Sequence, residues 1–299
     1  MHLSLRQLQI FSAIAEAGTT TAAGESIGLS QSAVSAALSE LESLLGLTLF
    51  DRIGRRLVLN GHGQALLPEA RMLLAGMADI ERRFRTVDET GAPAQWRVGA
   101  STTIGNYLMP VRIAGLQQRN AQARVELVIG NTREVVAAVQ RLEVDIGLIE
   151  GPCHAPGLEL APWQQDELVI VHGQDHPGTA SWQQGADMAQ LRAARWLLRE
   201  PGSGTREAAE QALLPHLHGF AEVLQLGGTE AIKQGAVAGL GLACLSWHAV
   251  ADLVALGKLQ VLATPLPPLR RQLWVVCHPG RRVPASLRQL LDLPQQVFA

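Results

Sequence analysis

The sequence lacks the marks of a membrane protein and of a disulfide-bonded protein. In its 299 residues no apolar run reaches the ~20 residues needed to span a bilayer, and the start contains no basic segment followed by an unbroken apolar stretch. The three cysteines lie far apart and form no C-x-x-C pair; they are Cys153, Cys244 and Cys277. We therefore expect no signal peptide, no membrane association, a cytoplasmic location, and cysteines that serve as small core residues in a reducing compartment.

Motifs of common hydrolases and nucleotide-binding enzymes are also missing. The sequence contains no G-x-S-x-G, no H-E-x-x-H, no paired cysteine–histidine spacing, and no G-K-[ST] ending in its Gly-rich segment at residues 199–206. The nine histidines are scattered, and the pair His216 and His218 is more typical of a solvated turn than of a metal site. These absences predict a protein without catalytic residues, bound metal or cofactor, so we do not expect an enzyme.

Positive charge is scarce where a nucleic-acid-binding surface would need it. Residues 1–90 contain eight arginines, no lysine and ten acidic residues, whereas a nucleic-acid-binding domain is normally basic. The positive charge is nevertheless clustered, because Arg52, Arg55 and Arg56 lie within five residues. If this segment binds DNA, each subunit neutralises few phosphates, and the affinity must come from pairing subunits.

Residues 1–46 show the spacing of three short helices. Apolar residues recur at helical intervals over residues 5–15, and Gly18 is suited to end that helix. Residues 19–21 offer a threonine cap for a second helix, and after the tight turn at Gly28 the hydroxyl of Ser30 can cap a third. Any small helical bundle shows similar apolar stripes, so this pattern alone leaves a helix-turn-helix and a plain bundle open.

The third helix and the segment after it favour DNA binding. One face of the helix is apolar and packs inward; it consists of Val34, Leu38, Leu41 and Leu45. Another face is small and polar, as a helix in a major groove requires, and carries Gln31, Ser32, Ser35, Ala36 and Ser39. After Gly46, the segment LTLFDRIGRRLVLN predicts a β-hairpin with Gly54 at its tip. A basic hairpin directly after such a helix is typical of a wing that contacts phosphates or the minor groove.

The segment over residues 5–52 resembles the N-terminal domain of LysR-type transcriptional regulators. The matching parts are Leu5-Arg6-Gln7-Leu8, Phe11, Ala22-Ala23, Ser30-Gln31-Ser32-Ala33-Val34-Ser35, Leu41-Glu42, Gly46 and Leu49-Phe50-Asp51-Arg52. The resemblance implies an all-α winged helix-turn-helix DNA-binding domain over residues 1–60. It implies DNA contacts through Thr20, Gln31, Ser32, Ser35, Arg52 and Arg55, with the arginines on phosphates or in the minor groove.

One position departs from the family pattern. Many LysR-type regulators carry Arg or Lys directly after the serine that matches Ser35, where this chain has Ala36. A usual base or phosphate contact is therefore absent. Either specificity shifts to Gln31, Ser32 and the wing, or DNA binding is intrinsically weak. Ordinary solvated helix positions are the alternative interpretation of the serines.

Residues 61–90 predict a single long linker helix with a heptad seam. The seam consists of Leu66, Ala70, Leu73, Met77, Ile80, Phe84 and Val87. At ~1.5 Å per residue the helix would extend roughly 40 Å, with a kink at Pro68 and a hinge at residues 91–93. A seam without a partner in its own chain predicts self-association. In LysR-type regulators the matching helix makes an antiparallel dimer contact, which implies a homodimer or homotetramer on a palindromic double-stranded DNA operator.

The remaining residues alternate apolar strands with helical segments, which favours an α/β domain. The expected strands cover residues 96–100, 125–129, 145–149, 167–171, 196–199, 222–226, 242–245 and 272–277. Four segments that follow strands stand out, at residues 101–103, 131–132, 150–151 and 199–206. Each one alone is equally well a helix cap or a turn. Because helix N-termini at the carboxyl ends of strands favour anions and polar small molecules, their joint placement predicts a ligand cleft.

The C-terminal part resembles the effector-binding region of the LysR-type subgroup that includes regulators of carbon fixation and sulfur assimilation, through runs such as GASTTIGNYLMP, VDIGLIEG and LREPGSGTR. The resemblance implies two periplasmic-binding-protein-like subdomains, one of residues 94–163 with 268–299 and one of residues 164–267. It implies an effector held by Ser101, Thr102, Thr103, Asn131 and Thr132 on one side and by Arg199, Ser203, Thr205 and Thr229 on the other. Hydroxyls with an arginine suit a small anion such as a carboxylate, a sulfur oxyanion or a phosphate ester.

An exported solute-binding protein is the alternative that shares this sensor fold. It would need a signal peptide, and residues 1–60 would have no role in it. The sequence therefore predicts a DNA-binding transcriptional regulator that a small-molecule effector modulates. Effector-driven closure of the two subdomains would change the angle between paired DNA-binding domains, and with it DNA bending and the access of RNA polymerase, a further partner to consider.

Overall fold

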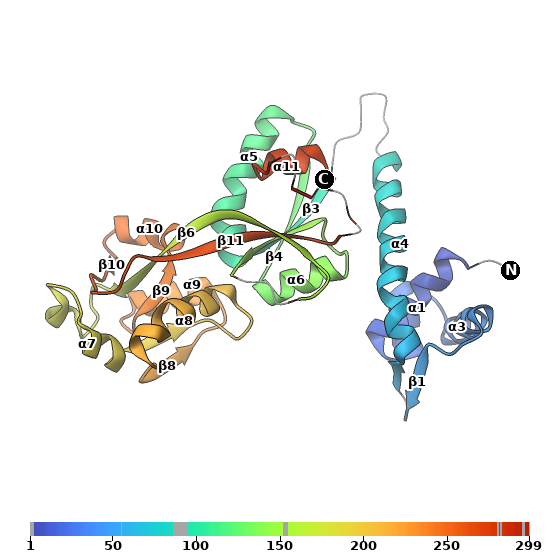
Figure 1. Cartoon of the computed structure of the whole chain (residues 1–299), viewed down its shortest axis with the longest axis horizontal. Helices are drawn as coiled ribbons and strands as arrows, with labels where there is room; N and C mark the ends of the chain where they lie inside the picture. The colour runs from blue at the N-terminus through green and yellow to red at the C-terminus, as the bar shows by residue number, and fades with distance from the viewer. Residues whose placement is uncertain are drawn as a thin grey trace. The chain divides into compact units, whose positions relative to one another are not determined.

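A computed structural model describes residues 3–54, 56–85, 95–151, 155–279, 281, 283–294 and 297–298. The chain divides into two compact units, Met1–Ala92 and Pro93–Ala299 (Figure 1). Within these residues, no helix combines the length and the hydrophobicity that crossing a membrane requires. The same part of the chain contains no group of three or more His, Cys, Asp or Glu side chains that could hold a metal ion.

The N-terminal unit begins with three helices and a β-hairpin. The elements are α1 (Leu5–Ala17), α2 (Thr20–Ile27), α3 (Gln31–Leu45), β1 (Phe50–Ile53) and β2 (Arg56–Leu59). At the three helix starts, the hydroxyls of Ser4, Thr19 and Ser30 each accept a backbone N–H, and a left-handed glycine follows each helix. Phe11 and Leu41 are fully buried in the core that the helices share. The predicted winged helix-turn-helix is confirmed.

The long helix α4 (Gly61–Arg85) runs unbroken through Pro68. Ala70 is fully buried in the helix-turn-helix core, and Leu66 and Leu74 pack against the same core. The first part of the heptad seam therefore faces its own chain. This corrects the expectation that the whole seam lacks an internal partner, because that expectation ignored the packing of α4 on α1.

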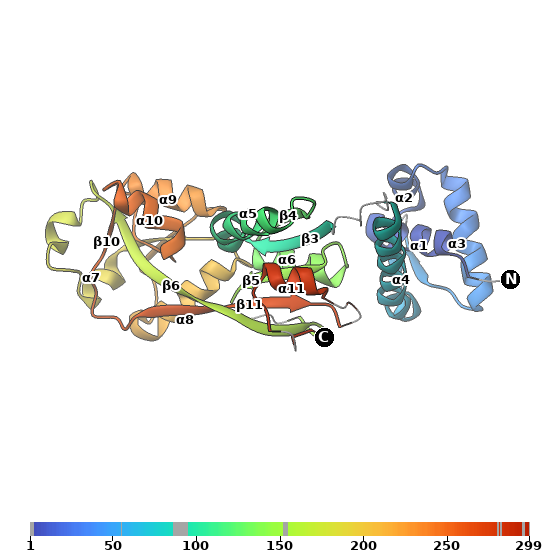
Figure 2. The same cartoon turned by 90° about the horizontal axis from the view of Figure 1, so that it is seen from above.

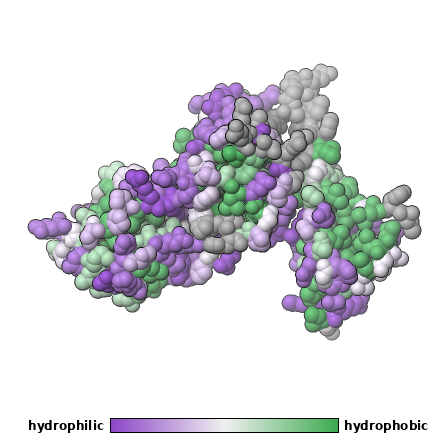
Figure 3. Space-filling model, in the orientation of Figure 1, coloured by the Kyte–Doolittle hydropathy of each residue, from purple (hydrophilic) through white to green (hydrophobic). Residues whose placement is uncertain are grey.

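The later part of the seam is exposed. The side chains of Leu73 and Ile80 are 50% and 60% exposed, and Figure 3 shows apolar surface on this unit. The side chain of Phe84, Val87 and the expected hinge at residues 91–93 lie outside the described residues. Exposed apolar side chains at helical spacing offer a surface for a second chain.

The C-terminal unit is built on a seven-stranded mixed sheet. Its strands are β3 (Gln95–Ser101), β4 (Arg124–Gly130), β5 (Ile146–Glu150), β6 (Glu159–Gly173), β9 (Ala243–Ser246), β10 (Leu259–Val261) and β11 (Leu269–Cys277). They lie in the order β10-β6-β11-β5-β3-β4, and β9 also pairs with β6. Strand β3 is parallel to β4 and β5, whereas β6 and β11 are antiparallel to their neighbours. A separate parallel pair consists of β7 (Arg195–Leu198) and β8 (Glu222–Gln225).

Each expected strand overlaps an observed one, with two differences. Strand β6 has 15 residues rather than the expected five over 167–171, because its first part carries Pro162 and polar residues that obscure an apolar strand pattern. The sequence pattern did not predict the three-residue strand β10.

Helical segments follow most of the strands of this unit and pack against them. They are η1 (Ile104–Leu108, a π-helical turn), α5 (Met109–Arg119), α6 (Thr132–Gln140), η2 (Thr179–Trp182), α7 (Met188–Ala193), α8 (Gly204–Leu217), α9 (Thr229–Val237), α10 (Trp247–Ala255) and α11 (Ala285–Leu290). One hydrophobic core draws its buried residues from 98–148 and 273–291, and two others draw theirs from 168–269. We call these parts the first half and the second half.

The long strands β6 and β11 pair with each other and run through both halves (Figure 2). They are the two strands that connect the first half with the second. The division at residues 163 and 268 remains a prediction.

Candidate functional site

A polar cluster lies at the start of α3 in the N-terminal unit. The Gln31 Nε2 atom donates to Thr20 Oγ1 at 3.2 Å and to Ser35 Oγ at 3.0 Å. The hydroxyls of Ser32 and Ser30 are 3.0 Å apart. Both amide hydrogens of Gln31 are therefore used within the unit, and among the described residues no donor meets its Oε1 atom. Gln31 presents an exposed acceptor, which can bind the amino group of adenine or cytosine.

The wing carries the positive charge that accompanies this cluster. Arg52 lies on β1, is exposed, and pairs in register with Leu57 on β2. Arg56 begins β2 and is also exposed. Arg55, the other predicted DNA contact in the wing, lies outside the described residues.

In the C-terminal unit, a buried ionic group joins the two halves around Glu150, the last residue of β5. One oxygen, Oε1, accepts from the Thr103 backbone N–H at 2.6 Å. The other, Oε2, accepts from Thr205 Oγ1 at 2.5 Å and from Arg271 Nη1 at 2.8 Å. Arg271, on β11, also donates through Nε to Asp166 Oδ2 on β6 at 2.7 Å. The group links β5, β6, β11 and α8.

The charges in this group are balanced internally. Burial alone would raise the pKa of the Glu150 carboxyl, but the Arg271 charge and the hydrogen bonds from Thr205 and Thr103 outweigh it and hold the pKa below its usual value. Burial lowers the pKa of Arg271, yet its two acidic partners, Glu150 and Asp166, raise it overall. Two acidic side chains surround one guanidinium, so the group has no spare positive charge for an anion.

A second group centres on Arg199, which is 4% exposed. Its Nη1 atom donates to Thr229 Oγ1 at 2.8 Å, and its Nη2 atom lies 3.5 Å from Thr102 Oγ1. Glu200 accepts from Nε and Nη2 at 2.8 Å each, which is a bidentate ion pair. Asn131 Nδ2 donates to the same carboxylate at 3.3 Å. Thr102 and Asn131 belong to the first half, and Arg199 and Thr229 belong to the second.

The nine predicted effector residues thus fall into several groups. Thr103 and Thr205 contact Glu150, while Thr102, Asn131 and Thr229 surround the Arg199–Glu200 pair. The hydroxyls of Ser101 and Thr132 donate to the backbone carbonyls of Leu148 and Glu150. Ser203 lies apart, in a groove between α6 and α8.

Sequence reasoning missed the acidic and basic partners of these hydroxyls. They are Asp166, Glu200 and Arg271, together with the role of Glu150. Asp166 and Arg271 have charged or amide neighbours on both sides in the sequence, so no local pattern singled them out as buried.

Comparison with known families accounts for nearly the whole chain. The family described as "Bacterial regulatory helix-turn-helix protein, lysR family" matches residues 5–64. The family described as "LysR substrate binding domain" matches residues 90–299.

Individual relatives agree with these families. YeiE of Escherichia coli (strain K12), named an uncharacterized HTH-type transcriptional regulator, is 44% identical over 292 residues, which are 98% of this chain and 97% of YeiE. The HTH-type transcriptional regulator CfxR of Cupriavidus necator is 32% identical over 286 residues, with 95% and 89% covered. The regulatory domain of Synechocystis PCC6803 CcmR, solved in complex with 2-PG, matches with a TM-score of 0.58 and 27% identity over 66% of this chain and 94% of that chain.

The two family matches follow each other along the chain, one in each unit apart from the first few residues of the second match, and the relatives are named as transcriptional regulators. The periplasmic-binding-protein-like fold expected for the C-terminal unit is confirmed by its mixed sheet with two connecting strands. The chain belongs to the LysR family of transcriptional regulators, and it combines a DNA-binding helix-turn-helix with a domain for a small-molecule effector.

Proposed function

We propose that the effector of this regulator is a small anion that binds at Arg199, between the two halves of the C-terminal unit. The proposal rests on the contacts of the Arg199 guanidinium. It is buried, it contacts a hydroxyl from each half, and it is paired with Glu200. The Glu200 side chain is 24% exposed. An anion from solution can therefore replace a carboxylate that already lies at the edge of the site.

The ionic group around Arg271 is less suited to such an exchange. Its two acidic partners have side chains that are 2% and 0% exposed, those of Glu150 and Asp166. Displacing either one would leave a buried acidic group without its cation, which costs several kcal/mol by order of magnitude. Arg199 has a single, more accessible acidic partner. Carboxylates, sulfur oxyanions and phosphate esters all match its bidentate geometry.

Binding at Arg199 would couple to the arrangement of the two halves. An anion in place of Glu200 would contact Thr102 from the first half and Thr229 from the second, so it would favour one relative placement of the halves. We propose that this bias reaches DNA through a homodimer or homotetramer formed on the exposed part of α4. Paired α3 helices would then bind a palindromic operator and control RNA polymerase in the cytoplasm.

Replacing either member of the Arg199–Glu200 ion pair by the uncharged glutamine should change anion affinity, and the two changes should have opposite signs. Arg199→Gln should weaken binding by roughly 30-fold or more, the usual effect of losing a buried charged partner. Glu200→Gln should strengthen binding by roughly tenfold, because the competing carboxylate is gone. Isothermal titration calorimetry of the full chain with sulfate, succinate and glucose 6-phosphate measures both effects.

Glu126→Gln is the matched control, because Glu126 pairs with Arg97 at the surface, away from this group. It should leave anion affinity unchanged. Unchanged or weaker binding by the Glu200→Gln variant would refute the exchange of Glu200 for an anion. Full binding by the Arg199→Gln variant would place the anion elsewhere.

A further inference from the structure

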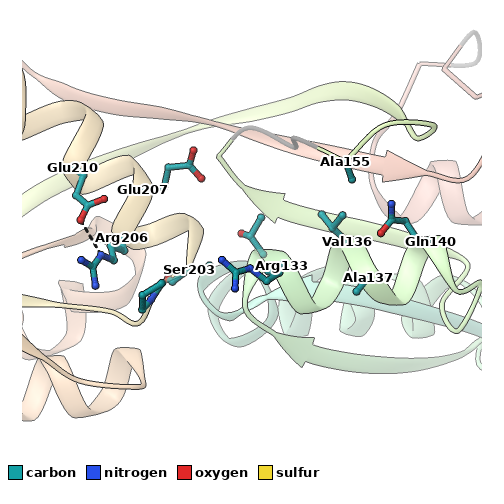
Figure 4. A pocket seen from close by; sticks show the side chains of 12 residues that line it. Arg133, Val136, Ala137, Gln140, Ala155, Ser203, Arg206, Glu207 and Glu210 are labelled. Atoms are coloured by element: carbon teal, nitrogen blue, oxygen red, sulfur yellow. Dashed lines mark hydrogen bonds and ion pairs between the residues drawn. The ribbon is translucent and has the colours of Figure 1, made fainter. Parts of the chain in front are cut away.

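A groove of about 700 Å³ lies between α6 of the first half and α8 of the second (Figure 4). Its volume is within the range of small-molecule sites. The groove shares Thr132 and Ser203 with the predicted effector residues, but neither Arg199 nor Arg271 lines it. It is therefore a space separate from the ionic groups described above.

A serine hydroxyl lines one end of the groove. Ser203 is 3% exposed and precedes α8, yet its side chain makes no capping hydrogen bond. No other partner for its hydroxyl is found in the part of the chain that the structure describes. Because Ser203 lines the groove and does not cap α8, its hydroxyl is available to a molecule bound there.

A cation stands at the same end. Arg133 is exposed, lines the groove, and its guanidinium has no ion pair or hydrogen bond among the described residues. Its side chain lies across Gly202, where an added Cβ would be 3.0 Å from Arg133 Nε. Because Gly202 adjoins Ser203, the guanidinium and the free hydroxyl are neighbours. Together with the start of the 14-residue helix α8, they favour a carboxylate.

The rest of the groove is apolar along one wall and acidic along the other. Figure 4 shows Val136 and Ala137 following Arg133 along α6, and Ala155 also lines the groove. This wall extends for about one helical turn, ~5.4 Å, the length of a short alkyl chain. On the α8 side lie Glu207 and Glu210, the latter paired with Arg206 at 2.8 Å. These carboxylates oppose a second negative charge on the ligand.

We propose that the groove between α6 and α8 is a second ligand site, which binds an amphipathic monocarboxylate. The carboxylate would contact Arg133 and Ser203, and a short apolar tail would lie on Val136, Ala137 and Ala155. Since α6 and α8 belong to different halves, a molecule in this groove would contact both, independently of the anion proposed at Arg199.

Titration of the full chain with straight-chain carboxylates from acetate to pentanoate tests the site. Each added methylene should strengthen binding by about fourfold, the usual gain from burying one such group. Arg133→Gln should weaken pentanoate binding by roughly tenfold or more, and Ser203→Ala by roughly threefold. Arg119→Gln, at an exposed arginine at the end of α5, is the matched control and should have no effect.

Two further comparisons separate this site from the one at Arg199. The Arg199→Gln variant should keep its affinity for pentanoate, and the Arg133→Gln variant should keep its affinity for sulfate. Equal binding of 1-pentanol and pentanoate, or of acetate and pentanoate, would overturn the proposal. So would an Arg133→Gln variant that binds pentanoate like the unaltered chain.

Discussion

Replacing Arg271 by methionine is expected to destabilise the C-terminal unit by about 3–5 kcal/mol, the usual effect of removing one partner from a buried ion pair. Methionine fills much of the same space, but it leaves Glu150 and Asp166 buried without their common cation. Urea unfolding at pH 7 measures the loss. Tryptophan fluorescence is a suitable probe because all six tryptophans belong to this unit.

The pH dependence of the same variant should differ in sign from that of the unaltered chain. In the unaltered chain the pKa of Glu150 is lowered on folding. Glu150 therefore contributes stability above its unfolded pKa of about 4.5, and that stability is lost as the pH falls below this value. Without Arg271, burial dominates and raises the pKa, so lowering the pH from 7 towards 5 should restore part of the lost stability.

Arg97→Met is the control for this experiment, because the Arg97–Glu126 pair lies at the surface. It should change the free energy of unfolding by about 1 kcal/mol or less. An Arg271→Met variant that behaves like the Arg97→Met variant, in size and in pH dependence, would show that the buried ionic group does not hold the two halves together.

Replacing Gln31 by alanine should weaken DNA binding by roughly 30-fold or more in a dimer, since each base-contacting side chain contributes about 1–3 kcal/mol. The measurement is fluorescence anisotropy with a duplex selected in vitro by the unaltered protein. The side chain is exposed and held by Thr20 and Ser35, so the fold should tolerate the change.

Salt dependence separates this effect from that of a phosphate-binding residue. Gln31 carries no charge, so the slope of log K against log salt should not change in the Gln31→Ala variant. In an Arg52→Ala variant the slope should fall by about 0.9 for each phosphate that the protein no longer neutralises. Unchanged affinity of the Gln31→Ala variant for the selected duplex would exclude Gln31 from base recognition.

The parts of the fold that the sequence predicted well depend on local signals. Caps such as Ser30 and the left-handed glycines place the helix ends within a residue or two, because these residues act on their own neighbours. Strand positions were also predictable from apolar runs. The length of β6 was not, because its pairing with β11 joins residues about a hundred positions apart.

The candidate site shows the same limit more strongly. The hydroxyls of Thr103 and Thr205 were expected to be free for an effector, yet both residues contact Glu150. Arg271 lies 121 positions from Glu150, and no local spacing reveals that they meet. Residue types and their positions after strands indicate where polar groups gather. The structure is needed to determine which of these groups are already paired.

The position of β11 in the sheet has a consequence for the order in which the chain can fold. Strand β11 lies between β5 and β6, yet it ends at residue 277, 127 positions after the end of β5. At about 5–20 residues per second, roughly 6–25 s of synthesis separate the two strands on the ribosome. During that interval β5, whose five residues are all buried in the finished sheet, has an unpaired edge. An unpaired edge favours aggregation of the newly made chain, and a chaperone that covers this edge would act before the last strand emerges.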